Sequence, residues 1–432
     1  MPNLQPLILN DDFRNALELL EKTTQNLFIT GRAGTGKSTL LQLFRNTTRK
    51  KIAVLAPTGV AALNVQGQTI HSFFGFPPNL ISSKDIFKRR DNRVFKNLDA
   101  LIIDEISMVR AEMLDNMDYF LKINRENILP FGGVQMIFFG DLFQLPPVVS
   151  SSEEKQFFQT VYESPFFFSA KIFESQAALA MLELQKVYRQ SERHFIRLLD
   201  AIRTNRIDSD DLDDLNDRHL QDFVSQEAYI TLCARNATAD GINEKKLQNL
   251  ETPEFKYLSE TIGEFNPLLS PAELVLRLRV GAQVIFVKND VEKQFVNGTI
   301  GRVIFLEEDS IKVAIEDKDG LPKVVDVSRA IWEIVRYEVD ENDPKKITPR
   351  TIGSFQQYPL RLAWAITIHK SQGKTFDRVI IDLGAGAFEH GQTYVALSRC
   401  RTLGGIVLRQ ALRTRDVMTD ERVVEFLRKK LN

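Results

Sequence analysis

The chain has 432 residues, more than a single hydrophobic core usually serves, so two or three domains are expected. Hydrophobic residues make up 43% and charged residues 26%, as in ordinary globular proteins, and no apolar run approaches the roughly 18 residues that a membrane span needs. A formal net charge of −1 argues against nucleic-acid binding through bulk positive charge, so any such contact depends on a local groove.

Cysteine and histidine are sparse. The two cysteines, Cys233 and Cys400, form no CxxC pair, and the five histidines are scattered, so neither a disulfide framework nor a zinc site is predicted. The first ten residues, MPNLQPLILN, lack the basic segment and long apolar run of a signal peptide. We therefore expect a soluble cytoplasmic protein without a membrane partner.

The first 150 residues alternate short apolar runs with helical patterns. Four runs are apolar on both faces, as buried parallel strands are: 26–30, 52–57, 100–105 and 134–141. Helical stretches separate these runs, which predicts repeated βαβ units and a parallel sheet. We assign residues 1–184 to this first α/β domain.

A second series of buried strands predicts a second α/β domain, with runs at 230–236, 364–370, 378–384 and 404–410. Short alternating strands with DKDG and ENDP turns interrupt it at 299–352, which predicts a small antiparallel insertion. The second domain is then 185–298 and 353–410, followed by a C-terminal helix at 411–432. The acidic run at 208–218 is interpreted as a solvated helix face.

The segment GRAGTGKST, residues 31–39, follows a predicted strand and opens a helix, and it fits the GxxxxGK[ST] pattern of a P-loop. Its glycines let backbone N–H groups point at phosphate oxygens, and the helix N-terminus adds positive potential. Lys37 is expected to reach the β- and γ-phosphates, and the Ser38 hydroxyl to bind Mg²⁺. The predicted nucleotide-binding residues are Gly31, Ala33, Gly34, Thr35, Gly36, Lys37, Ser38 and Thr39.

The run LIIDEIS, residues 101–107, ends a predicted parallel strand with two carboxylates. Such a strand end faces the same phosphate crevice as the P-loop. Asp104 is placed to hold Mg²⁺ and Glu105 to polarise the attacking water. Alone, an apolar run that ends in Asp-Glu is more often structural, but downstream of this P-loop the functional interpretation is preferred.

Seven strings decide what kind of ATPase this is. They are APTGVAALNVQGQTIHSFF (56–74), LIIDEISM (101–108), FFGDLFQLPPV (138–148), LELQKVYRQ (182–190), LRLRVGAQVIFVKND with FVNGTIGRV (276–303), AITIHKSQGKTFD (365–377) and YVALSRCRT (394–402). In this order the chain resembles superfamily 1 helicases of the 5′-to-3′ group, which contains RecD and the Pif (petite integration frequency) family. The resemblance implies two RecA-like domains, an SH3-like insertion in the second, and the cofactors ATP and Mg²⁺.

Three further residues complete the predicted catalytic set. Gln144 ends a strand beside the nucleotide, where its amide reaches the γ-phosphate or its water; without the neighbouring motifs, a Pro-terminated strand end would be the simpler interpretation. The resemblance implies that Arg189 and Arg399 are arginine fingers reaching across the cleft from the second domain. It also places Gly373 at the nucleotide.

Hydroxyl, imidazole and amine donors hold nucleic-acid phosphates without reading sequence, and the motifs carry such donors in both domains. The predicted nucleic-acid-binding residues are Pro57, Thr58, Gly59, His71, Ser72, Phe73, Asn297, Thr367, His369, Lys370 and Ser371. Phe73, Phe74 and Phe76 offer faces for base stacking, although a core patch is the more natural interpretation for at least one of them. The resemblance implies that a loop at about 64–80 forms a wedge at the duplex junction.

The chain departs from the family pattern before the P-loop. The family usually has a glutamine there that contacts adenine, and by spacing from Gly31 this position falls at or near Phe13, where no glutamine is found. Our hypothesis is that ATP is preferred but other nucleoside triphosphates are also used.

We therefore predict an ATP-dependent 5′-to-3′ DNA helicase, monomeric, acting on single-stranded DNA and single-strand/duplex junctions. Forks, G-quadruplexes and RNA–DNA hybrids are plausible substrates by resemblance. One alternative is a nucleotide-gated single-strand binder that does not unwind. A second, a P-loop phosphotransferase, leaves the second-domain arginines and the 365–377 string unexplained.

Overall fold

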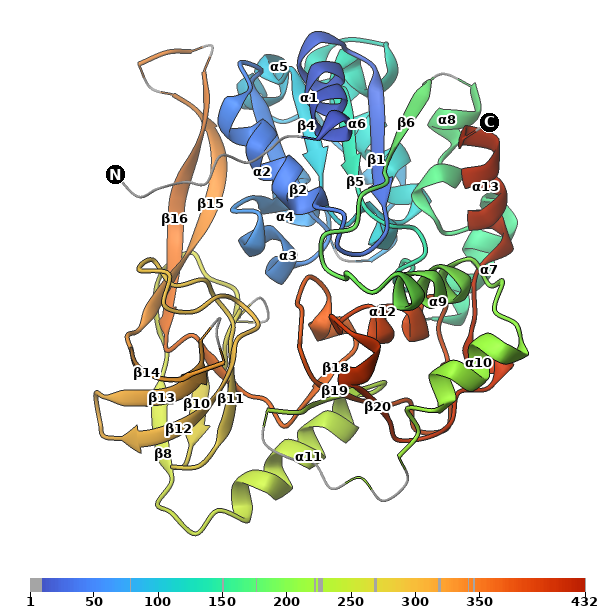
Figure 1. The fold of residues 1–432 in the computed structure, drawn as a ribbon. Coiled ribbons are helices and arrows are strands. Elements are labelled where there is room, and N and C mark those ends of the chain that lie inside the picture. The colour runs from blue at the N-terminus through green and yellow to red at the C-terminus, as the bar shows by residue number, and fades with distance from the viewer. Residues whose placement is uncertain are drawn as a thin grey trace.

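The structure is a computed structural model that describes residues 10–431, apart from 78, 150, 176, 221–222, 224–227, 268–269, 318–319, 341 and 345. Its described residues form two parallel-sheet domains and an antiparallel module (Figure 1). The first domain lies above the second in this view, and helices α9 and α12 lie at the boundary between them. The architecture confirms the predicted α/β fold class of two RecA-like domains with an all-β insertion.

The first domain is built on a six-stranded sheet in the order β3-β2-β4-β5-β1-β6, in which every pairing is parallel. Its strands are β1 Asn26–Gly31, β2 Ile52–Ala56, β3 Gln68–Thr69, β4 Ala100–Ile103, β5 Gln135–Phe139 and β6 Leu179–Leu184. The central strands β4 and β5 are buried at every residue, which explains why their sequences read as continuous apolar runs. The four predicted strands of this domain are confirmed.

Helices cover both faces of this sheet, as βαβ connections require. They are α1 Asp11–Lys22, α2 Lys37–Thr47, α3 Gly59–Asn64, α4 Ile70–Phe74, α5 Arg93–Asn97, α6 Ala111–Arg125, α7 Ser152–Val161 and α8 Lys171–Ser175. The first of them starts where Asn10 accepts the backbone N–H of Phe13 on its side chain, a normal N-cap. Because all the strands run the same way, the segments after β1, β4 and β5 meet at one edge of the sheet.

The second domain has a four-stranded parallel sheet in the order β18-β7-β19-β20. Its strands are β7 Ile230–Cys233, β18 Ala365–Thr367, β19 Val379–Asp382 and β20 Ile406–Leu408, all within predicted runs. Its helices are α9 Arg193–Arg203, α10 Ser209–Asn216, α11 Asn236–Gln248 and α12 Gln392–Leu397. The acidic run is helix α10, mostly solvated as predicted, although Asp211 is buried and pairs with Arg197 at 2.5 Å.

The antiparallel module is larger than predicted, because it begins at Phe255 and ends at Leu362 rather than spanning 299–352. One sheet has the order β14-β13-β12-β11-β17, a second β15-β16-β9 and a third β10-β8. Strand β11 is buried at all four residues and so reads as a parallel strand, yet it pairs antiparallel with β12 and β17. The strands are β8 Phe255–Leu258, β9 Glu260–Gly263, β10 Val275–Leu278, β11 Gln283–Phe286, β12 Ile300–Leu306, β13 Ile311–Glu316, β14 Pro322–Val327, β15 Ala330–Val339, β16 Ile347–Gln357 and β17 Leu360–Leu362.

The long hairpin of β15 and β16 leaves this module and runs beside the first domain (Figure 1). Tyr337 on β15 is buried, and its hydroxyl accepts the backbone N–H of Val54 on β2 at 2.9 Å. The Tyr337 ring meets the edge of Phe73 with a centroid distance of 6.1 Å. The hairpin thus packs against the first domain near the edge of the sheet formed by the two-residue strand β3.

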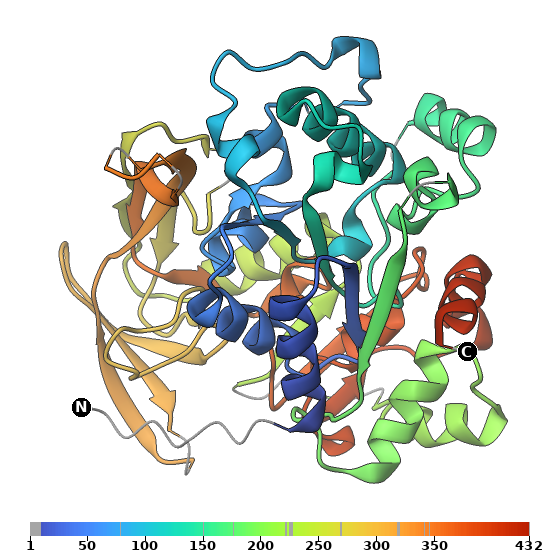
Figure 2. The ribbon, with the colours of Figure 1, turned by 90° about the horizontal axis from the view of Figure 1, so that it is seen from above.

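Helix α13, Glu421–Leu431, returns from the second domain to the first. Phe426 stacks on Phe168 with a centroid distance of 4.3 Å, and Lys430 donates to the carbonyl of Leu179 on β6. The helix begins ten residues later than the predicted segment 411–432. In both views it lies on the side of the molecule opposite the antiparallel module (Figures 1 and 2). Within the described ranges, no helix has both the length and the apolar character to cross a bilayer.

We expect Tyr337→Phe to lower the free energy of unfolding by about 1–3 kcal/mol, because the ring remains while the buried Val54 N–H loses its acceptor. Urea unfolding followed by tryptophan fluorescence measures the change. Tyr119→Phe, at a site that is 41% exposed, is the control. Equal stability of the two variants would contradict the docking role of the hydroxyl.

Candidate active site

The P-loop connects β1 to α2 at the edge where the sheet strands end. Helix α2 begins at Lys37, and its N-cap, Gly36, has φ 87° and supplies no side-chain cap, so the first amides of the helix are open to an anion. Gly34, with φ 82°, packs so tightly that a Cβ on it would lie 2.5 Å from the Cβ of Arg189. The geometry has the features of a phosphate cradle, with Ser38 and Thr39 exposed at its mouth.

Lys37 folds back onto the loop in this structure. Its ammonium donates to the carbonyls of Gly31 at 2.7 Å and Arg32 at 3.1 Å. Burial lowers the pKa of Lys37, while Asp141 and Glu105 act in the opposite direction. The Thr35 hydroxyl also donates to the carbonyl of Arg32, at 3.0 Å, and so braces the same turn.

The two carboxylates predicted after β4 face this loop. Burial, and then the charge of Glu105, raise the pKa of Asp104 to about 7, while Lys37 opposes the shift. Burial likewise raises the pKa of Glu105, against the influence of Lys37 and Arg399. Glu105 has φ 50°, a left-handed conformation that is uncommon for a residue with a side chain and that clusters at functional sites.

The residues present fit a magnesium ion. Mg²⁺ prefers hard oxygen ligands and in nucleotide sites takes one or two from the protein and others from phosphates and water. Ser38 and Asp104 supply a hydroxyl and a carboxylate, and the raised pKa of Asp104 indicates a buried carboxylate short of compensating charge. Within the described part of the chain, no group of three or more His, Cys, Asp or Glu side chains could hold a metal, so a self-contained protein cage is not what these residues form.

Two arginines line the cleft beside the P-loop. Arg399 follows α12 and is 1% exposed; its guanidinium contacts the Val395 carbonyl at 3.0 Å and the Ser398 hydroxyl at 2.8 Å. Arg189 contacts the Ser398 carbonyl at 3.1 Å. Burial, and then the charge of Arg399, lower the pKa of Arg189 to about 9. Among the described ion pairs, neither guanidinium has a carboxylate partner.

The position of Arg189 corrects part of the prediction. It lies on the connector between β6 and α9, and Tyr188 beside it donates its backbone N–H to the carbonyl of Gly34 at 2.9 Å. Because this connector is packed on the P-loop, Arg189 does not reach across from the second domain. Only Arg399, of these two arginines, lies within the second domain.

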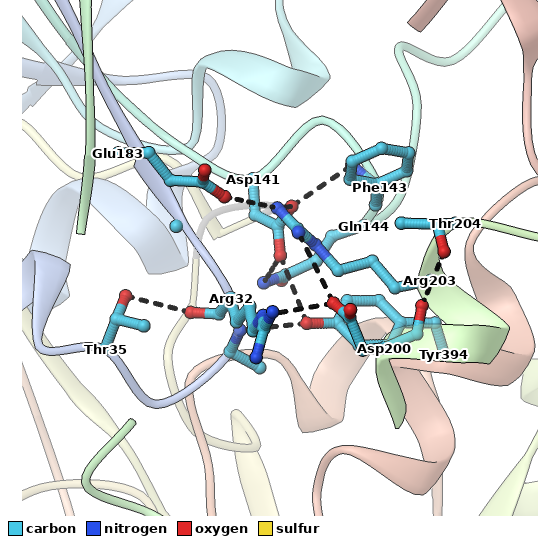
Figure 3. Close-up of polar contacts among 12 residues, drawn as sticks. Arg32, Thr35, Asp141, Phe143, Gln144, Glu183, Asp200, Arg203, Thr204 and Tyr394 are labelled. Carbon is cyan, nitrogen blue, oxygen red and sulfur yellow. Dashed lines mark hydrogen bonds and ion pairs between the residues drawn. The ribbon is translucent and has the colours of Figure 1, made fainter. Parts of the chain in front are cut away.

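A buried polar network joins the two domains beside these groups (Figure 3). The Tyr394 hydroxyl, on α12, accepts the backbone N–H of Ala33 in the P-loop at 2.9 Å and donates to Asp141 at 3.3 Å. Asp141 follows β5 in the first domain and also accepts the side-chain amide of Gln144 at 3.3 Å. The predicted Gln144 is therefore present at the cleft, 7% exposed and tied to a residue the motif analysis did not assign.

Arg203, the last residue of α9, is the cationic centre of the network. It is 5% exposed and lies 3.4 Å from Asp141, 3.6 Å from Glu183 and 3.9 Å from Asp200. Its guanidinium also stacks over the ring of Phe143. Asp200 pairs in turn with Arg32 of the P-loop at 3.0 Å, so two P-loop residues are tied to the second domain (Figure 3).

The predicted nucleic-acid residues separate into exposed and internal groups. Thr58, Ser72 and Lys370 are exposed, and His369 is partly exposed and pairs with Glu389 at 3.1 Å. Asn297 accepts from the Lys374 ammonium at 3.0 Å. Pro57, next to Thr58, and His71 are half-buried, and burial lowers the pKa of His71. Gly59 is buried at the start of α3.

Three residues of that set are internal, which corrects their predicted role in this arrangement of the chain. Thr367 is 3% exposed and accepts the Lys370 backbone N–H, and Ser371 is fully buried and donates to the Ile368 carbonyl at 2.6 Å. Phe73 is packed against Phe74, Phe95 and Tyr337. Phe74 and Phe76 are buried as well, so the core interpretation holds for all three rings and the 64–80 segment presents none of them as a wedge.

Phe13, at the position expected to hold an adenine-binding glutamine, lies behind the P-loop. It is 4% exposed, its ring tip would lie 2.9 Å from a Cβ on Gly36, and its edge faces Tyr188. Tyr188 is 52% exposed beside the P-loop, with the Lys186 ammonium 5.1 Å from the centre of its ring. Gly373 has φ 73° and open space around it, and no contact ties it to the cradle.

Sequence analysis missed three members of this site. Asp141 and Tyr394 lie inside the strings FFGDLFQLPPV and YVALSRCRT, and their fixed position next to Gln144 and Arg399 was the available signal. Arg203 lies on the amphipathic helix α9, where only its burial in the structure distinguishes it from other arginines.

Comparisons with known proteins identify the family and the fold. The model of the PIF1-like helicase family matches residues 8–213. The curated ATP-dependent DNA helicase Pif1 of Bdellovibrio bacteriovorus is 32% identical over 430 residues, covering 97% of this chain and 91% of that one. The chain spans only 58% and 60% of the lengths of the zebrafish (Danio rerio) and mouse (Mus musculus) relatives, each 36% identical to it.

Two solved structures of Pif1 from Bacteroides are informative. The one in complex with ADP-AlF4 is 37% identical, with a TM-score of 0.90 over 98% of this chain and 97% of that one. The one bound to single-stranded DNA is 38% identical over the same shares, with a TM-score of 0.70. The present structure is thus more similar overall to the complex with ADP-AlF4 than to the complex with single-stranded DNA.

The raised pKa of Asp104 predicts a pH-dependent magnesium requirement. At pH 6 this carboxyl is mostly protonated and at pH 8 mostly ionised, so the apparent Mg²⁺ affinity with bound ADP should rise roughly tenfold between them. Stability has the opposite sign: the metal-free protein should lose stability as pH rises from about 4 to about 7, because over this range the carboxyl is ionised in the unfolded chain but still protonated in the folded one.

Fluorescent-ADP binding titrated with Mg²⁺ at the two pH values measures the effect. Since the terminal phosphate of ADP also titrates, Asp104→Asn supplies the baseline. A pH profile that is identical in the two proteins would refute the assignment of Asp104.

Proposed function

This chain belongs to the PIF1-like helicase family, and we propose that it hydrolyses ATP to translocate 5′ to 3′ along single-stranded DNA and unwind duplexes. The observation that carries the proposal is the pair of arginines that face the P-loop without carboxylate partners, opposite two buried carboxylates. Buried charges without partners are costly, so such an arrangement fits an anion bound at the arginines together with a cation bound at the carboxylates. A triphosphate with Mg²⁺ has the matching charge pattern.

Each group then has a chemical role. The P-loop amides and Lys37 bind phosphate oxygens, and Ser38 and Asp104 would hold Mg²⁺, which supplies charge neutralisation at the phosphates when bound. Glu105 accepts a proton from the attacking water, and Gln144 orients that water. Arg399 stabilises the charge that develops in the transition state, and Arg189, fixed to the P-loop, assists it.

Exposed donors near both sheets form the proposed DNA track. Thr58 and Ser72 lie on the first domain and His369 and Lys370 on the second. Such groups bind phosphates without reading bases, which suits a motor that must pass over any sequence. The relatives whose solved structures hold single-stranded DNA and forked duplex DNA support DNA as the substrate.

A surface segment of the first domain replaces the buried phenylalanines as the proposed strand-separating element. Phe87 is 72% exposed, and the exposed cations Lys84 and Arg90 lie on the same segment. Arg89 ties the segment to α4 by donating to the Phe74 carbonyl at 2.8 Å. An exposed aromatic ring among cations can stack on a terminal base pair while phosphates are held.

We expect ATPase activity to rise strongly with single-stranded DNA, and duplexes with a 5′ tail to be unwound in preference to those with a 3′ tail. Lys37→Ala should abolish turnover, and Glu105→Gln should abolish turnover while ATP binding persists, because the glutamate acts on the water rather than on the phosphates. The measurements are a phosphate-release assay and strand separation with each tail.

The outcomes separate the competing proposals. Stimulated ATPase without strand separation would favour a nucleotide-gated single-strand binder. Preference for a 3′ tail would reverse the proposed polarity, and turnover by Lys37→Ala would refute the site itself.

We expect the protein to discriminate only weakly between the bases of different nucleoside triphosphates. Because Phe13 offers no hydrogen bond and Tyr188 offers a ring, binding by stacking is expected, and every base has a face to stack. We predict that GTP, CTP and UTP are hydrolysed with kcat/KM within about tenfold of ATP, since a hydrogen-bonding pocket is what gives larger discrimination. Parallel steady-state assays decide this, and strict dependence on ATP would contradict it.

A further inference from the structure

Asp141 lies at the point where the two domains meet beside the nucleotide cleft. Asp141 is 1% exposed, and both of its carboxylate oxygens contact named polar groups. Oδ1 accepts the Phe143 backbone N–H at 3.2 Å and lies 3.4 Å from Arg203. Oδ2 accepts the Tyr394 hydroxyl and the Gln144 amide, each at 3.3 Å (Figure 3).

These contacts fix which way the Gln144 amide faces. A carboxylate accepts hydrogen bonds and donates none, so Gln144 must turn its NH₂ group toward Asp141. The carbonyl oxygen Oε1 is then the end available to accept a hydrogen bond from a water. A reversed amide would set two acceptors against each other and offer the water a donor instead.

Two of the partners of Asp141 belong to the second domain. Tyr394 lies on α12, five residues before Arg399, so any movement of this helix displaces the tyrosine and the arginine together. The start of α12 is pressed against the Gln144 segment: Gly391 is its N-cap, and a Cβ there would collide with the carbonyls of Phe143 and Gln144. The orientation of Gln144 therefore depends on groups that arrive with Arg399.

We propose that Asp141 is a positioning residue that orients Gln144 toward the attacking water, and that Tyr394 and Arg203 make this orientation conditional on closure of the two domains. The inference rests on the proposed ATP hydrolysis at this cleft. Gln144 then acts on water only when Arg399 is in place, so two requirements for hydrolysis are met by one movement. A purely structural role, in which Asp141 only neutralises the buried Arg203, makes a different prediction.

The decisive experiment is a double-mutant cycle on single-stranded-DNA-stimulated ATPase activity, with Asp141→Asn, Gln144→Ala and the double variant. The Asn side chain keeps the shape of Asp but both donates and accepts, so the Gln144 amide loses its single orientation. We expect Asp141→Asn to lower kcat on the order of ten- to a hundredfold, with KM for ATP changed less than about threefold. The double variant should be no slower than the slower single variant, because both changes remove one function.

A structural role would give losses that multiply in the double variant, or a matching fall in thermal stability without a selective effect on kcat. Either result, or a wild-type kcat in Asp141→Asn, overturns the proposal. Asp211→Asn is the matched control, since it alters a buried carboxylate that is also paired with an arginine but lies on α10 rather than beside Gln144. It should leave kcat unchanged.

If Asp141→Asn does not fold, Tyr394→Phe decides the question in the same cycle. It removes one hydroxyl and keeps the ring, and its kcat loss should vanish in the Gln144→Ala background; a loss that persists there overturns the proposal. A wild-type chain without ATPase activity would instead refute the proposed function, whereas an active wild type with multiplying losses would refute only the role of Asp141.

Discussion

Unpaired buried charge is the constraint on which the nucleotide cleft depends. Asp104 and Glu105 have raised pKa values, and Arg189 and Arg399, which line the same cleft, have lowered pKa values. Each shift has burial as its first cause, so burial disfavours the charged form of each group. Sheet topology brings the acids and the P-loop to one edge of the first domain, while α12 brings Arg399 from the second. The fold thus gathers acids and arginines without carboxylate partners around the P-loop, and a magnesium-bound phosphate would complement both sets, with its cation facing the acids and its oxygens facing the arginines.

The same interface connects the nucleotide cleft to the second domain and its insertion. Arg32 and Ala33 of the P-loop contact Asp200 and Tyr394, so the second domain is tied to the phosphate cradle itself and not to its arginines alone. At the far side of the first sheet, the hairpin of the antiparallel module docks through Tyr337. The second domain and its insertion therefore contact the first domain at these two separate places, in addition to the contact made by α13. The Bacteroides Pif1 structure bound to single-stranded DNA is less similar to this one than the structure with ADP-AlF4, although the two have nearly the same sequence identity to this chain.

Sequence predicted well what periodicity and local motifs control. Both parallel sheets and the P-loop were predicted because fully buried strands and glycine-rich turns leave local signatures. The module boundary was wrong because β11 is as apolar as a parallel strand, and burial alone does not reveal the direction of a neighbour. Phe73 was assigned to stacking although its ring is covered by Tyr337, which lies more than 260 residues away in sequence. Arg203 was missed for the same reason, since its partners Asp141 and Glu183 come from two other elements.

The internal positions of Thr367 and Ser371 show why a motif overcounts contacts. Both hydroxyls bond to backbone within three residues, as short hydroxyl side chains do when they shape a turn. That turn is the short 3₁₀ segment that carries His369 and Lys370, which are the members left facing outward. One part of the motif therefore builds the support, and the other part is available to a phosphate. The near-neutral net charge of the chain is consistent with this division, because a track of a few supported donors needs little bulk positive charge.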